Sequence, residues 1–141
     1  MAVSTAGEIP VRVADAEQSC GSGRVLAILS EVESMLTRLA DSGTCGSIDL
    51  RNLLAGPGDR ETLRRILAEG EVSAVVHALG ETQVHETAVR GVWWVTHCAE
   101  DGKTVAEFIE VTHVPEILKT PPDDIADGLE VLFAKRRALD G

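Results

Sequence analysis

One stretch of the sequence, residues 72–114, constrains the fold most, because its hydrophobic residues follow the period of two that is typical of β-strands. Three turn signals divide it: Gly80-Glu81, Arg90-Gly91 and Asp101-Gly102. Glycine and aspartate accept the positive φ angles that tight hairpin turns require. The sequence therefore predicts a four-stranded antiparallel meander. Its strands are expected at Val72–Leu79, Thr82–Val89, Val92–Ala99 and Lys103–Val114.

The period changes to that of an α-helix on both sides of this stretch. Residues 24–41 carry apolar side chains at intervals of three and four, and Gly43 suits the left-handed position that ends a helix. A shorter helix opens at Gly56-Pro57, and a third opens at Pro121 with Thr120 as its N-cap. Their predicted buried residues are Leu63, Ile66 and Leu67 in the second helix and Ile125, Leu129, Leu132 and Phe133 in the third.

These elements predict an α+β fold in which about three helices pack mainly on one face of the sheet. The other face would then meet solvent or a partner. Residues 1–22 show little periodicity and are expected to form a flexible tail, and residues 23–141 a single domain. The segment Ile48–Leu53 is too short to classify and is expected to be extended or irregular.

The charge balance excludes several classes of partner. The chain has 13 lysines and arginines against 23 aspartates and glutamates, a net charge of −10. This balance argues against binding to nucleic acid or to an anionic membrane surface. No apolar run is long enough to span a membrane, and the first residues do not resemble a signal peptide. The sequence therefore indicates a cytoplasmic location.

Catalytic motifs are absent from the sequence. It contains no phosphate-binding P-loop, no G-x-S-x-G, no H-E-x-x-H and no tyrosine. We therefore predict no catalytic residue, no cofactor and no enzymatic activity. One alternative remains, a metal or iron–sulfur carrier that uses His85, His97 and Cys98. Because His97 and Cys98 are neighbours on a strand, they are expected to point to opposite faces, which weakens this alternative.

The hairpin at Asp101-Gly102 predicts which residues share a face. A two-residue turn there places His97 opposite Ala106, and it leaves both faces of the hairpin substantially apolar. A surplus apolar face is typical of a protein–protein contact. The candidate contact residues are Trp93, Trp94, Val95 and Phe108. Hydrophobicity alone favours Trp93 as the more open tryptophan.

Three runs of sequence resemble hydrogenase expression/formation proteins of the HupH/HyaF type, in their C-terminal domain. They are GEVSAVV from Gly70, VHETAVRGVWWVTH from Val84 and DGKTVAEFIEVTHVPEIL from Asp101, within a similar region of about residues 48–137. The resemblance implies a non-enzymatic assembly factor or chaperone for a nickel–iron uptake hydrogenase. Its implied partners are the precursor of the iron–sulfur small subunit or other maturation proteins, and self-association stays open. The family pattern also implies that Trp93 faces inward and Trp94 outward.

Overall fold

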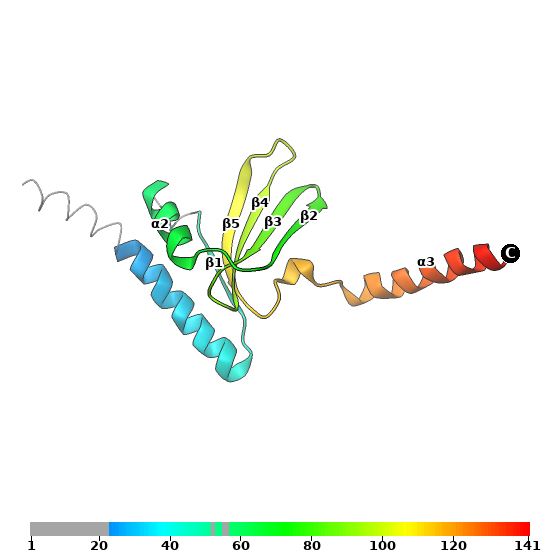
Figure 1. Ribbon diagram of the computed structural model, residues 1–141, viewed down its shortest axis with the longest axis horizontal. Helices are drawn as coiled ribbons and strands as arrows, with labels where there is room; N and C mark the ends of the chain where they lie inside the picture. Colours follow the sequence, from blue (N-terminus) through cyan, green and yellow to red (C-terminus); the bar gives the residue numbers. More distant parts are fainter. Residues whose placement is uncertain (1–22, 52, 55–56) are drawn as a thin grey trace, which may run out of the picture.

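The computed structural model describes residues 23–51, 53–54 and 57–141 (Figure 1). Residues 23–42 form a helix, called here the first helix, and it confirms the helix predicted at 24–41. The tail expected at residues 1–22 lies outside the described residues. The later elements are β1 (Gly46–Asp49), α2 (Pro57–Leu67), β2 (Ser73–Ala78), β3 (Gly80–Glu86), β4 (Val92–Cys98), β5 (Thr104–Val111), the 3-10 turn η1 (Glu116–Leu118) and α3 (Pro122–Asp140).

The sheet is antiparallel and has five strands in the order β1-β5-β4-β3-β2. The predicted meander is present as β2 to β5, so the α+β class is confirmed. The prediction of four strands is wrong, because β1 adds a fifth strand beside β5. Ile48, in the middle of β1, is opposite Ile109 of β5 and is buried. β1 has only four residues, too few for a periodicity to show.

The β4–β5 register agrees with the prediction from Val92 to His97 and departs from it nearer the turn. His97 is opposite Ala106 and Trp94 is opposite Ile109, but an irregularity after His97 pairs Cys98 with Thr104 instead of Val105. The β2–β3 hairpin differs, because Ala78 pairs with Gly80 and the turn is centred on Leu79. Gly80 has φ +99°, and a Cβ there would collide with the carbonyl oxygen of Cys98. Because the turn is shifted, each β2 side chain lies on the opposite face of the sheet from the face that a turn at Gly80-Glu81 predicts.

The first helix and α2 cover one face of the sheet and build the main core (Figure 1). Gly43, at φ +74°, ends the first helix and donates its N–H to the carbonyl of Leu39, as predicted. In α2, Leu63 and Leu67 are buried as predicted, whereas Ile66 is half exposed. The main core contains Val25, Ile28, Val32, Met35, Leu39, Ile48, Leu50, Leu63, Leu67, Val92, Trp94, Ile109 and Val111.

The third helix does not join this layer. α3 has no buried residue, and it extends away from the sheet beyond η1 (Figure 1). The prediction that three helices pack mainly on one face is therefore wrong for α3, and so is its predicted buried stripe. Pro121, with φ −59° and ψ 148°, is the N-cap residue and makes no side-chain cap hydrogen bond, so Thr120 is not the cap. The extended backbone at Lys119 and Pro121 directs the chain away from the sheet. No helix of the described residues is long and apolar enough to cross a membrane.

Candidate protein-binding face of the sheet

The face of the sheet that points away from the first helix and α2, called here the open face, carries a smaller apolar cluster. Val84, Trp93 and Val95 are buried in it, and Ala74 and Leu118 pack against them. The strand register extends this cluster into rows across the sheet. One row runs through Ala74, Val84, Val95 and Phe108, and the next through Val76, Thr82, His97 and Ala106.

Trp94 lies on the covered face, against α2. Its indole N–H donates to the Glu107 carboxylate at 3.0 Å, and the Arg64 guanidinium carbon lies 4.6 Å from the ring centroid. The side chain is 4% exposed, so the expectation that Trp94 is open is wrong. The reason is that α2 lies over this position, and its arginines also pair with the buried Glu107, Arg60 at 2.7 Å and Arg64 at 3.4 Å.

Trp93 lies on the open face and is buried too, at 7% exposure. Its indole N–H donates to the carbonyl oxygen of Thr112 at 3.1 Å. Leu118 of η1 packs on the same cluster. The expectation that Trp93 faces inward therefore agrees with its burial, although it lies on the face opposite to the main core.

The four predicted contact residues differ in what a partner can reach. Val95 is fully buried and Phe108 is partly exposed, with its ring edge-on to His97 at a centroid separation of 5.7 Å. Val76 and Ala106, in the adjacent row, are also partly exposed. A partner on the open face would thus touch Phe108 and this row, while Trp93 and Val95 support them from beneath. The binding role of all four residues stays a prediction.

The structure separates the residues of the metal alternative. His85 is opposite Trp94 and so lies on the covered face, whereas His97 is opposite Ala106 on the open face. His97 Nδ1 instead lies 2.8 Å from the hydroxyl of Thr82. Over the described parts of the chain, no group of three or more His, Cys, Asp or Glu side chains is placed to hold a metal ion. The geometry therefore does not support a carrier site at His85, His97 and Cys98.

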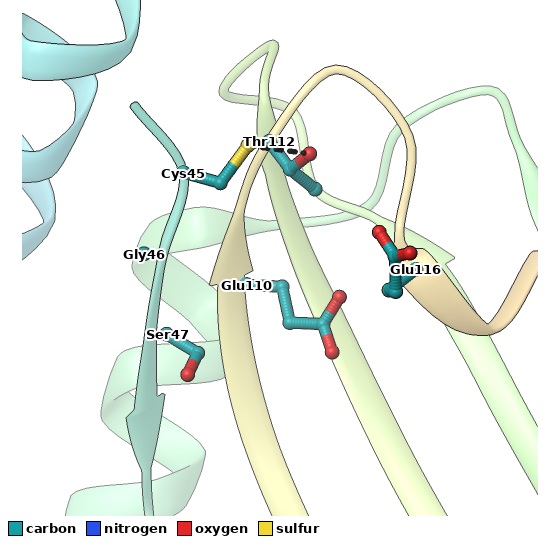
Figure 2. Close-up of a pocket in the computed structure, with 6 residues that line it drawn as sticks. All are labelled: Cys45, Gly46, Ser47, Glu110, Thr112 and Glu116. Carbon is teal, nitrogen blue, oxygen red and sulfur yellow. Dashed lines mark hydrogen bonds between the residues drawn. The ribbon is translucent and has the colours of Figure 1, made fainter. Parts of the chain in front are cut away.

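An acidic cleft of about 280 Å³ borders the open face between β1, β5 and η1. Figure 2 shows the Glu110 carboxylate reaching from β5 toward the side of the cleft where Glu116 lies. On the β1 side, the Cys45 thiol lies 3.3 Å from the hydroxyl of Thr112. The cleft has no signal in the sequence, because one of its walls is β1, whose four residues are too few to show a periodicity. The cleft is lined by Cys45, Gly46, Ser47, Glu110, Thr112 and Glu116.

Burial in this cleft raises the pKa of the Glu110 carboxyl, and the charge of Glu116 acts in the same direction. His97 and a backbone hydrogen bond from Glu116 lower this pKa, but burial has the larger effect. The raised pKa means that the folded state holds this proton more tightly than the unfolded state. Its contribution to stability is therefore fully present below the unfolded pKa of about 4.3 and is lost as pH rises through the folded pKa.

We expect Glu110→Gln to remove this loss of stability. The free energy of unfolding of the variant should fall less than that of the wild type as pH rises from about 4 towards neutrality. Urea unfolding followed by circular dichroism at a series of pH values measures this difference. Glu61→Gln, on the exposed side of α2, is the matched control. Parallel pH profiles for Glu110→Gln and the wild type would contradict the prediction.

The comparisons with known proteins agree with the sequence resemblance. A family model described as "HupH hydrogenase expression protein, C-terminal conserved region" matches residues 24–139. The chain belongs to this family. The match is wider than the region of about residues 48–137 that the sequence motifs indicated, mainly because it begins in the first helix.

Relatives in this family are named for hydrogenase expression. Hydrogenase expression/formation protein HoxQ of Azotobacter vinelandii is 30% identical over 94 residues, which cover 67% of this chain and 33% of that protein. HupH of Rhizobium leguminosarum bv. viciae is 38% identical over 63 residues, which cover 43% of this chain and 22% of that protein. The chain thus spans less than half the length of the curated relatives it matches.

A solved structure shares the fold. Hydrogenase expression protein HupH from Thiobacillus denitrificans ATCC 25259 is similar with a TM-score of 0.78 and 40% sequence identity. The similarity covers 82% of this chain and 97% of that one. This solved protein therefore shares the architecture of the sheet and helices described above.

Proposed function

We propose that this protein is a non-enzymatic accessory factor in the maturation of a nickel–iron hydrogenase, acting in the cytoplasm. It would bind an unfinished subunit, the precursor of the iron–sulfur small subunit, or another maturation protein. The observation that carries the proposal is the family match over residues 24–139, together with relatives named for hydrogenase expression and formation.

The open face supports a binding role. Its accessible apolar side chains are Val76 on β2 and Ala106 and Phe108 on β5, and the strands between them, β3 and β4, contribute the buried apolar layer. The acidic pair Glu110 and Glu116 lies at the edge of this surface. Apolar surfaces with a polar rim are typical of protein–protein contacts. We propose that the partner presents an apolar segment to the open face and basic residues to the acidic cleft.

Two neighbouring valines of β2 offer a matched test of this surface. Val76 is partly exposed on the open face, whereas Val75 points to the other face and is 49% exposed. We expect Val76→Asp to weaken binding of the small-subunit precursor about tenfold or more, because a charge at the contact loses apolar burial and is desolvated. Val75→Asp should bind as the wild type does.

The measurement is co-purification of the tagged protein with the precursor, and recovery of hydrogenase activity in a host that lacks the gene. The wild type and Val75→Asp should restore activity, and Val76→Asp should restore less. Equal recovery by both variants would place the contact elsewhere. Full hydrogenase activity in the host without any copy of the gene would refute the proposed function itself.

A further inference from the structure

α3 is a long helix without a partner in the described part of the chain. It has 19 residues, none of them buried. Most helical stability in proteins comes from packing an apolar face against a partner. A helix of this kind therefore calls for a surface outside its own sheet.

The apolar residues of α3 form a stripe suited to another helix. Ile125, Leu129, Leu132 and Leu139 follow one another at intervals of four, three and seven, which are the core positions of a heptad pattern. Arg136 occupies the core position between Leu132 and Leu139. All four apolar side chains are at least 60% exposed. Phe133 flanks the stripe and is half exposed.

The charges of α3 are divided between its two halves. The first half carries only acids and the second half carries a basic cluster, although Asp140 follows at the end. An antiparallel pair of such helices places the acidic half of each against the basic half of the other, and it also opposes the two helix dipoles. A parallel pair would place like charges together. The acids are Asp123, Asp124, Asp127 and Glu130, and the bases are Lys135, Arg136 and Arg137.

We propose that the partner of α3 is the α3 helix of a second copy of this chain, packed antiparallel to form a symmetric dimer. Each copy supplies the same stripe, as a two-fold interface requires. α3 extends away from its own sheet, so two copies can meet along this helix while both open faces stay accessible (Figure 1). The dimer is thereby compatible with binding of a maturation partner but does not depend on it.

The middle of α3 sets the expected register. With the centre of the pair at the height of Val131 along the axis, Leu129 of one copy lies near Phe133 of the other. The two Ile125 residues are then about 18 Å apart along the axis, since an α-helix rises about 1.5 Å per residue. The apolar side chains of the stripe interdigitate at the centre, and the Arg136 side chain of each copy reaches toward the acidic first turn of the other.

The test is sedimentation equilibrium of the full chain over a range of concentrations, with two adjacent residues as a matched pair. Leu132 lies in the stripe and is 64% exposed, whereas Val131 lies outside it and is 54% exposed. We expect the wild type to dimerise, Leu132→Glu to weaken the dimer at least tenfold, and Val131→Glu to leave it unchanged. Because both side chains are exposed in the single chain, neither change threatens the fold of the monomer.

Charge reversal tests the orientation. Arg136→Glu should weaken the dimer several-fold at low salt, and Asp124→Arg in the same chain should restore it, because only an antiparallel pair brings Arg136 of one copy to the level of the acidic first turn of the other. Failure of the second change to restore the dimer would overturn the antiparallel arrangement. A wild type that stays monomeric at all concentrations would overturn the dimer.

A third variant, Val76→Asp, distinguishes the proposed dimer from one competing arrangement. If α3 instead packed on the open face of the second copy, both Leu132→Glu and Val76→Asp would dissociate the dimer. In the arrangement proposed here, Val76→Asp leaves the dimer intact. These measurements use purified protein without a hydrogenase subunit, so their failure is distinct from failure of the proposed function.

Discussion

Replacing Trp94 with alanine is expected to lower the free energy of unfolding by about 3–5 kcal/mol, the usual cost of emptying a buried aromatic site. The ring is 4% exposed, packs in the main core and lies under the guanidinium of Arg64. Its removal also leaves the buried Glu107 carboxylate without the indole donor at 3.0 Å. Urea unfolding followed by far-ultraviolet circular dichroism measures the loss.

Trp94→Phe is the control for this substitution, because it keeps much of the apolar volume and removes the indole N–H donor. It should cost about 1–3 kcal/mol, the range for a buried polar group that loses its partner. A loss below about 1 kcal/mol for Trp94→Ala would contradict the burial of this side chain against α2. It would then support the outward position of Trp94 that the family resemblance implied.

Leu63→Ala is expected to cost about 2–5 kcal/mol, because Leu63 is fully buried where α2 meets the sheet. Ile66, one turn along the same helix, is half exposed, so Ile66→Ala should change stability by less than about 1 kcal/mol. Thermal and urea unfolding of the two variants give the comparison. Similar losses for both would mean that the buried edge of α2 includes Ile66, as its apolar pattern predicted.

The parts of the fold that depend on neighbouring residues could be predicted from the sequence. The turn signal at Asp101-Gly102 placed His97 opposite Ala106 correctly, although an irregularity after His97 shifts the pairing by one residue next to the turn. Gly43 marked the end of the first helix for the same reason, since a left-handed glycine is a local signal. The predicted position of the β2–β3 turn was wrong, because the turn is centred on Leu79, an apolar residue that shows no turn preference.

The parts that depend on distant residues could not be predicted. β1 is a strand only because β5, some sixty residues later, offers it an edge, and its four residues carry no pattern of their own. The burial of Trp94 depends on α2 crossing that point of the sheet. The stripe of α3 was recognised, but periodicity shows that a helix has an apolar face and does not show which surface covers it.

The two strands that border the acidic cleft, β1 and β5, are held in the sheet unequally, because β1 is short. β4 is paired on both sides, and β5 is held by β4 along nearly its whole length, whereas β1 is an edge strand with one partner and four paired positions. Local opening in proteins begins where the fewest contacts must break. Detachment of β1 would remove one wall of the cleft while the meander of β2 to β5 stays folded. Detachment of β1, the strand with the fewest paired positions, thus controls access to Glu110. A ligand that bridges Ser47 and Glu110 would hold β1 in the sheet.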